Sequence, residues 1–184
     1  MIIKVIRGSS EYSLCRYVLD PRKQLPEKRA LAKPLQGRIA LETDSAQPFL
    51  LCAGMPGHKA HEFARNLKTV AKLNQRVQKT VAHYSISLPD SDREQVSHQM
   101  MVAITKSLLY QMGHARCPYF AVEHHDASQK HWHVVVSAVT FGGDWVNGRF
   151  DRYRLRTVEE NLEQQFRLTS SRRRPVANIK NLSA

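Results

Sequence analysis

Apolar residues along the chain follow two spacings, one typical of β-strands and the other of amphipathic helices. Alternating or β-branched runs predict strands at residues 2–6, 80–88, 117–124 and 131–141, with shorter ones at 38–43 and 48–55. Apolar side chains three or four positions apart predict helices at residues 9–19, 58–77, 92–112 and 150–168, of which 92–112 is the longest. The pattern indicates an α+β fold with about five strands and four helices.

Two stretches of the chain lack either spacing. Residues 20–37 are basic and contain three prolines, which predicts a loop whose Lys and Arg side chains can reach phosphates. The last residues include Arg172, Arg173 and Arg174 and show no periodicity. We therefore predict one folded domain over residues 1–168, followed by a basic tail over residues 169–184.

The charge balance narrows the class of partner. Of the 184 residues, 28 are Lys or Arg and 16 are Asp or Glu, so the formal net charge is +12. A surplus of this size favours a polyanionic partner, and nucleic acid before membrane because no amphipathic anchor accompanies it. The same surplus disfavours a metallohydrolase that acts on small phosphates.

The number of cysteines and the sequence of the N-terminus indicate in which cellular compartment the protein is expected. Cys15, Cys52 and Cys117 are odd in number and lack CxxC spacing, which indicates reduced thiols instead of a disulfide framework or a zinc knuckle. The first apolar run is too short for a signal peptide, and no stretch approaches the length of a membrane span. We expect a soluble, cytoplasmic protein with no membrane insertion.

The most distinctive stretch is the histidine-rich segment at residues 122–139, which runs into a β-branched strand. Successive side chains of a strand point to opposite faces, so His131 and His133 share one face and Trp132 lies on the other. A hairpin between this strand and the apolar run ending at His124 would bring three imidazoles together. Three histidines converging from neighbouring strands predict a site for a divalent ion.

Other polar residues lie close to this cluster in the sequence. Asp126 follows His124 on the same side and is suited to orient an imidazole or to accept a proton. His125 alternates to the opposite face and has no assigned role. Isolated histidines such as His83 and His98 are better interpreted as ordinary surface or satisfied polar residues.

The spacing His124-x-Asp126-x-x-x-x-His131-x-His133 before an apolar run resembles the third motif of plasmid mobilisation relaxases. These proteins belong to the nucleases with a His-hydrophobic-His signature. The resemblance implies a central, mostly antiparallel five-stranded sheet with flanking helices. It also implies that the chain nicks single-stranded DNA by tyrosine attack.

The resemblance extends to residues upstream of the histidines. Residues 16–20 look like the family's N-terminal nucleophile motif, which assigns that role to Tyr17; the alternative is a core aromatic. Tyr12 is a competing nucleophile, but it lacks the motif and lies about one and a half helical turns away. Ser9 matches the family's serine near the DNA phosphate. Ser87 matches the serine of the second motif, with Ser85 as the same-face alternative.

The match continues downstream to about residue 168, where Asp151-Arg152-Tyr153-Arg154 is similar to the family's entry into the following helix. Arg154 and Arg156 are therefore candidate DNA contacts. Many relaxases continue into helicase, primase or secretion-signal regions, so we expect this chain to be a relaxase domain alone.

The resemblance implies a reaction, a cofactor and partners. The phenol oxygen of Tyr17 would attack the phosphodiester at an origin of transfer, giving a 5′-phosphotyrosyl linkage and initiating conjugative mobilisation. Mg²⁺ or Mn²⁺ is the ion that the family implies, although Zn²⁺ fits imidazole ligands better by ligand type. Implied partners are single-stranded DNA, accessory DNA-binding proteins of the relaxosome and a coupling protein.

Two other interpretations stay open. A replication initiator or transposase of the same nuclease group carries its tyrosine after the histidine pair, where Tyr153 is the only tyrosine. A non-catalytic basic DNA-binding protein would use the histidines for a structural metal. The first alternative would use Tyr153 in place of Tyr17, and the second would use no nucleophile.

Overall fold

The computed structural model describes residues 1–20 and 50–170. The predicted basic loop, the strand at 38–43 and most of the predicted tail lie outside the described residues. In chain order the described elements are β1 Ile2–Gly8, α1 Glu11–Val18, β2 Leu50–Ala53, α4 Ala60–Ala71, β3 Val81–Ser87, the 3-10 turn η1 Asp90–Asp92, α5 His98–Gln111, β4 Tyr119–His124, β5 His131–Ser137 and α6 Asp151–Gln165.

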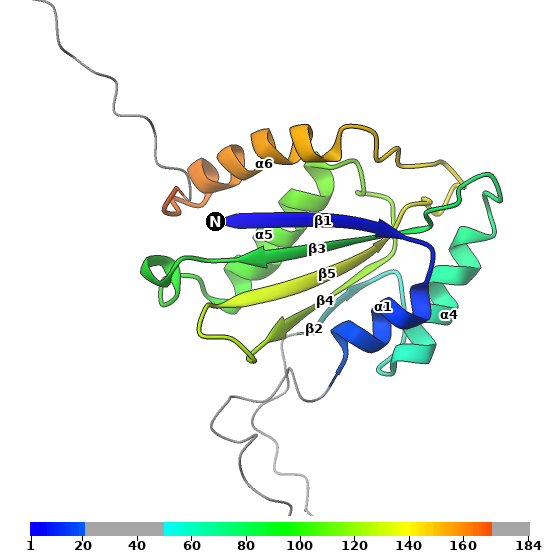
Figure 1. Cartoon of the computed structure of the whole chain (residues 1–184), viewed down its shortest axis with the longest axis horizontal. Helices are drawn as coiled ribbons and strands as arrows, with labels where there is room; N and C mark the ends of the chain where they lie inside the picture. The colour runs from blue at the N-terminus through cyan, green and yellow to red at the C-terminus, as the bar shows by residue number, and fades with distance from the viewer. Residues whose placement is uncertain (21–49, 171–184) are drawn as a thin grey trace, which may run out of the picture.

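The five strands form one sheet in the order β1-β3-β5-β4-β2, and every neighbouring pair is antiparallel (Figure 1). This confirms the predicted α+β class and the five-stranded antiparallel sheet. Strand β5 lies at the centre because Val134, Val135 and Val136 are fully buried, which suits a strand packed on both faces.

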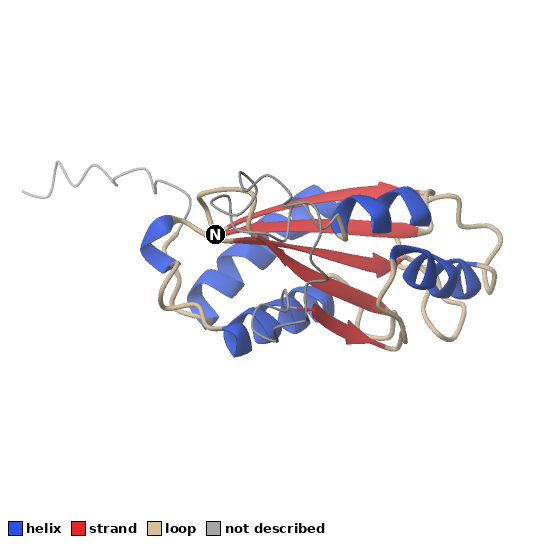
Figure 2. Ribbon diagram, turned by 90° about the horizontal axis from the view of Figure 1, so that it is seen from below, coloured by secondary structure: helices blue, strands red, loops and turns tan. Residues whose placement is uncertain are grey.

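One face of the sheet is covered by α5 and α6, and Figure 2 shows helices on both sides of the strands. Trp132, Tyr84 and Val134 point to this face and pack against Ile104 of α5 and Leu162 of α6. We call it the covered face. The Trp132 indole donates to the hydroxyl of Thr105 on α5 at 3.0 Å, so its one polar atom is satisfied in the core.

The opposite face is covered at one end only, by α1 and α4, which pack against each other. Phe63 of α4 stacks on Phe120 of β4 with ring centroids 4.5 Å apart, and Val18 of α1 and Val135 of β5 belong to the same buried cluster. The other end of this face carries His83, Ser85, Ser87, His124, His131 and His133, as the strand registers show. We call it the histidine face.

Helix α5 begins later than its apolar spacing predicts. The predicted helix at 92–112 starts only at His98, after Ser97 caps it by accepting from the Met100 N–H at 3.3 Å. Asp92 is buried because its carboxylate instead accepts from both the N–H and the hydroxyl of Thr169. The prediction that this helix is the longest was wrong, since α6 has 15 residues and α5 has 14.

Two further predictions concern the end of the domain and the state of the cysteines. Thr169, the first residue of the predicted tail, is thus bonded to the domain, and the division at 168 stays a prediction. Of the three cysteines, Cys15 and Cys117 are buried free thiols, and burial raises the pKa of each to about 12.

Candidate active site

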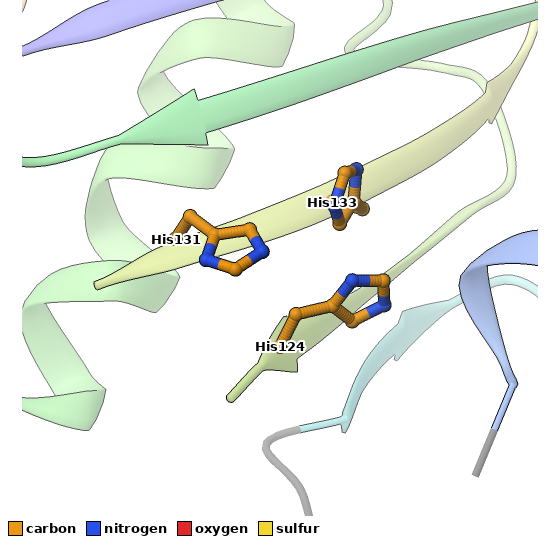
Figure 3. Close-up of side chains that lie close together, drawn as sticks. All are labelled: His124, His131 and His133. Atoms are coloured by element: carbon orange, nitrogen blue, oxygen red, sulfur yellow. The ribbon is translucent and has the colours of Figure 1, made fainter. Parts of the chain in front are cut away.

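The β4–β5 hairpin brings three histidines together on the histidine face (Figure 3). His124, the last residue of β4, pairs directly with His131, the first residue of β5, and His133 lies two residues further along. One ring nitrogen from each of the three lies within 4.8 Å of the others. The hairpin predicted from the sequence is therefore present, and it places three imidazoles around one point.

His124 is 2% exposed and is tied to the helix that carries Tyr17. Its Nε2 lies 2.7 Å from the carbonyl oxygen of Val18, which can only accept, so Nε2 carries the proton and donates. This tautomer leaves Nδ1 as the nitrogen that can ligate a metal. A backbone carbonyl that fixes the tautomer is the usual outer partner of a metal-binding histidine.

His131 has an acceptor beside each of its ring nitrogens. Its Nδ1 lies 3.0 Å from the carbonyl oxygen of Gln129, and its Nε2 lies 3.1 Å from Oδ1 of Asp126. The carboxylate predicted to orient an imidazole therefore contacts one of the three histidines. An acceptor beside each nitrogen holds the His131 ring in one orientation.

His133 contacts a fourth histidine that the sequence pattern did not single out. Nε2 of His83 on β3 lies 2.7 Å from Nδ1 of His133, and the two rings stack with centroids 4.9 Å apart. The interpretation of His83 as an ordinary surface or satisfied polar residue missed this contact with a candidate ligand. The signal in the sequence was its position four residues before Ser87 on a predicted strand, because that spacing places both on one face.

Tyr17 lies beside this pair of histidines. Its ring centroid is 6.0 Å from the His133 ring and 6.1 Å from the His83 ring, both in edge-on geometry. The side chain is 49% exposed, so it is not the core aromatic that was the alternative. Helix α1 thus brings a solvent-accessible phenol from the N-terminal part of the chain to imidazoles on β3 and β5.

The two candidate serines of the second motif also face the cluster. Ser87 is the register partner of His131 and Ser85 of His133, so both hydroxyls lie on the histidine face next to the imidazoles. Ser9 is exposed in the turn between β1 and α1. Ser85 and Ser87 therefore lie beside the histidines, whereas Ser9 follows Gly8, at the end of β1 opposite to the Ile2–Lys4 end that is level with them.

The candidate arginines lie elsewhere. The Arg154 side chain is half-buried and donates to the carbonyl of Gln111, at the end of α5, at 3.4 Å. Arg156 is exposed on α6 and lines a small cavity with Ile3 and Lys4 of β1. Neither residue belongs to the histidine cluster, and their proposed contact with DNA stays a prediction. His125 is not among the three converging histidines either.

The donor set fits a metal ion. Three imidazole nitrogens at this separation can occupy part of a coordination shell, and positions left for other oxygen ligands are typical of catalytic sites and not of closed structural sites. The carbonyl of Val18 and the His83 ring each engage the second nitrogen of a candidate ligand. The fold and this cluster define a candidate metal-dependent enzyme built on an antiparallel sheet.

Comparison with protein families identifies the class further. The sequence matches the family described as "Relaxase: MobA/VirD2-like, nuclease domain" over residues 39–168, more than two thirds of the chain. The chain belongs to this family, which confirms the relaxase resemblance and assigns it DNA binding and nuclease activity in general terms. Tyr17 and Ser9 lie before the matched segment, so the position of Tyr17 near the histidines comes from the structure alone.

Two further findings complete the comparisons. A search among curated proteins gave no match to this chain. Within residues 1–20 and 50–170, none of the helices combines the length and the apolar character that crossing a membrane requires.

Proposed function

We propose that this chain is a site- and strand-specific DNA relaxase that nicks single-stranded DNA at an origin of transfer and so initiates conjugative mobilisation of a plasmid. Tyr17 is the nucleophile, and His124, His131 and His133 hold a divalent ion. The observation that carries the proposal is the position of the exposed Tyr17 ring, 6.0 Å from the His133 ring.

The reaction is a transesterification. The phenol oxygen of Tyr17 attacks phosphorus, the bond from phosphorus to the 3′ oxygen breaks, and the 5′ phosphate becomes linked to the tyrosine. The phenolic proton leaves as this bond forms, and the departing 3′ oxygen takes up a proton to give a 3′-hydroxyl. One phosphodiester is exchanged for another, so the strand can be rejoined.

The chain's own residues prepare this step. Asp126 contacts His131 and is suited to accept a proton directly or through that imidazole. Val18 and His83 fix the rings of His124 and His133, so two of the ligands are oriented before DNA arrives. A bound divalent ion would polarise the scissile phosphate and offset its negative charge. Mg²⁺ or Mn²⁺ is expected from the family, and Zn²⁺ from the imidazole ligands.

The open part of the histidine face is the expected path of the DNA strand. Ser85 and Ser87 offer hydroxyl donors to phosphates near the scissile bond, and Ser9, after the other end of β1, offers one to a phosphate further along the DNA. Arg154 and Arg156 are proposed to contribute charge from α6. In a cell, accessory relaxosome proteins and a coupling protein would complete the assembly.

The position of Tyr153 argues against the replication-initiator arrangement. Tyr153 is on α6 and lines a cavity with Val5 and Arg7 of β1, two side chains that point away from the histidine face. Strand β1 is separated from β5 by β3, which alone amounts to about 10 Å. Of the two tyrosines, only Tyr17 has its ring in contact distance of a histidine in the cluster.

Covalent adduct formation tests the proposal. Labelled oligonucleotides that carry candidate origins of transfer are incubated with the protein and Mn²⁺, and the products are separated on a denaturing gel. We expect a protein–DNA band with the unaltered protein and its complete loss in Tyr17→Phe. The matched control is Tyr12→Phe, on the same helix and with similar exposure (54%), which keeps the band.

Other results of this experiment would contradict the proposal. Loss of the adduct in Tyr153→Phe together with its persistence in Tyr17→Phe would identify the replication-initiator class. A protein that retards labelled single strands in a native gel but forms no adduct with any oligonucleotide would be a non-catalytic DNA-binding protein.

A further inference from the structure

A groove opens at the outer edge of β1, on the side of the sheet away from the histidines. Its volume is about 670 Å³, within the range of roughly 300–1,000 Å³ that small-ligand pockets occupy. The walls come from β1, from residues 76–79 before β3 and from residues 145–153 at the start of α6. We call it the β1–α6 groove.

Three aromatic side chains in this groove are exposed to solvent. Trp145 is 53% exposed, Phe150 58% and Tyr153 76%. The Phe150 and Tyr153 rings lie 6.3 Å apart, and the guanidinium of Arg149 lies 4.9 Å from the centre of the Phe150 ring. Grouped exposed aromatics beside a cation form a stacking platform for the flat faces of unpaired bases.

The charges of the groove favour an anionic occupant. Arg76, Lys79, Arg149 and Arg152 all line it and are all exposed. Its one carboxylate, Asp151, is engaged by Arg7, whose Nε lies 2.7 Å from Oδ2. Basic side chains therefore surround the aromatic rings, as in sites that hold phosphates and stack bases together.

The floor of the groove is held in place by Arg7. Besides Asp151, its guanidinium donates to the carbonyl of Val146 at 2.7 Å and packs closely against Gly148. Phe150 has a left-handed backbone with φ of 65°, which directs the chain into α6 and is unusual for an aromatic residue. The aromatic platform is thus attached to a well-fixed segment.

Strand β1 connects the groove to the histidine face. It is an edge strand, so Lys4 and Ile6 point to the histidine face while Val5 and Arg7 point to the groove. A second cavity of about 390 Å³ is lined by Lys4 and Ile6 together with Arg152, which also lines the groove. A single strand of DNA that crosses the histidine face can therefore pass the edge of β1 and enter the groove.

We propose that the β1–α6 groove binds unpaired nucleotides of the same single-stranded DNA that occupies the histidine face, at a distance from the scissile phosphate. Tyr153, Phe150 and Trp145 stack on the bases, and the surrounding Arg and Lys side chains contact the backbone. This inference rests on the proposed function, because the proposed substrate supplies the strand.

Binding measured without cleavage tests the proposal. Anisotropy of a labelled oligo-dT is titrated with protein in EDTA, which prevents the metal-dependent reaction. Tyr153→Ala should weaken binding about five- to hundredfold, the loss expected from one stacked base. The matched control is Tyr110→Ala, which removes an equally exposed tyrosine (75%) from α5 outside the groove and should change binding less than twofold.

Tryptophan emission gives a second readout. Trp145 is half-exposed in the groove and Trp132 is fully buried, so oligo-dT should quench Trp145 alone. A Trp145→Phe protein, which keeps Trp132, should lose the quenching.

The outcomes separate failure of this inference from failure of the proposed function. Unaltered affinity in Tyr153→Ala together with unquenched Trp145 would overturn the groove, provided that the unaltered protein binds oligo-dT. A duplex that binds as tightly and depends on Tyr153 to the same degree would also overturn it, because paired bases cannot stack there. If the unaltered protein binds no oligonucleotide, single-stranded or duplex, the proposed function itself fails.

Discussion

The two faces of the sheet use the same strands for different purposes. On β5, His131, Trp132 and His133 are consecutive, yet the indole is fully buried under α5 while the two imidazoles lie on the histidine face. The covered face is a continuous apolar surface. The histidine face has an apolar end under α1 and α4 and a polar end that holds His83, Tyr17 and the candidate ligands.

Adjacent residues of one strand point to opposite faces, so one face can supply folding stability and the other the candidate chemistry. Burial of large apolar side chains on the covered face contributes most to the free energy of folding. At the polar end of the histidine face, contacts join imidazoles with one another, with Tyr17 and with Asp126, so substitutions there should alter metal or DNA binding more than stability. Substitutions on each face therefore test whether the covered face supplies stability and the histidine face supplies binding.

The largest effect is expected for Trp132→Ala. The change removes a fully buried indole and its hydrogen bond to Thr105, so the free energy of unfolding should fall by about 3–5 kcal/mol. Urea unfolding followed by circular dichroism measures the loss. Trp145→Ala, which removes a half-exposed indole, should cost no more than about 0.5 kcal/mol. Equal costs for the two would contradict the assignment of the core.

A pH-dependent loss of stability is the next largest effect, and it comes from a histidine behind the covered face. His114 is buried, its Nδ1 lies 3.0 Å from the Ser137 carbonyl, and its ring contacts Tyr84. Burial, and secondarily the charge of Arg7, lowers the pKa of His114 from 6.5 to about 3. Between pH 6.5 and about 3, His114 therefore binds a proton in the unfolded chain but not in the folded chain.

The contribution of neutral His114 is complete above pH 6.5 and is lost as the pH falls toward 3. The loss should be about 1.4 kcal/mol per pH unit in this window. Urea unfolding of metal-free protein at pH 7.5, 6 and 4.5 should show a shallower pH dependence in His114→Gln than in the unaltered protein. The exposed His61 provides the control, because His61→Gln should leave the slope unchanged. Identical slopes in all three proteins would refute the role of His114.

The smallest effect is expected for His83→Ala, on the histidine face. Without the His83 ring, the orientation and tautomer of His133 are no longer fixed, so Mn²⁺ affinity measured by calorimetry should fall about 10- to 100-fold. His83→Gln should recover part of the affinity, because its amide oxygen can accept from His133. Urea stability should change little in either variant, the reverse of Trp132→Ala. Unchanged metal affinity in His83→Ala would show that this contact does not orient a ligand.

Much of the fold followed from local patterns. The period of two in β1 and β3 and the spacing of apolar residues in α6 are visible because each of these elements buries one face. Strand β5 is buried on both faces and was recognised from its β-branched run. Helix boundaries were less accurate. The start of α5 depends on Asp92 bonding to Thr169, a contact between residues 77 positions apart that no local spacing reveals.

The residues of the candidate site likewise include some that local spacing revealed and others that it did not. His124, His131 and His133 are close in sequence, and a short hairpin is enough to bring them together. His83 was missed because its partner is fifty residues away on a different strand. The aromatic groove could not be predicted either, because Trp145 and Tyr153 meet Lys79 and Val5 only when α6 packs against the edge of β1.

The amino-acid sequence was enough to establish which residues share a face, the basic charge of the chain and a histidine spacing typical of relaxases. These properties depend on the fixed geometry of strands and helices and on residue type. The packing of the helices on the sheet was needed to place Tyr17 beside His133 and Tyr153 on the other side of the sheet. Such distances depend on how helices pack on a sheet, which is set by the sum of many weak contacts and not by any single motif.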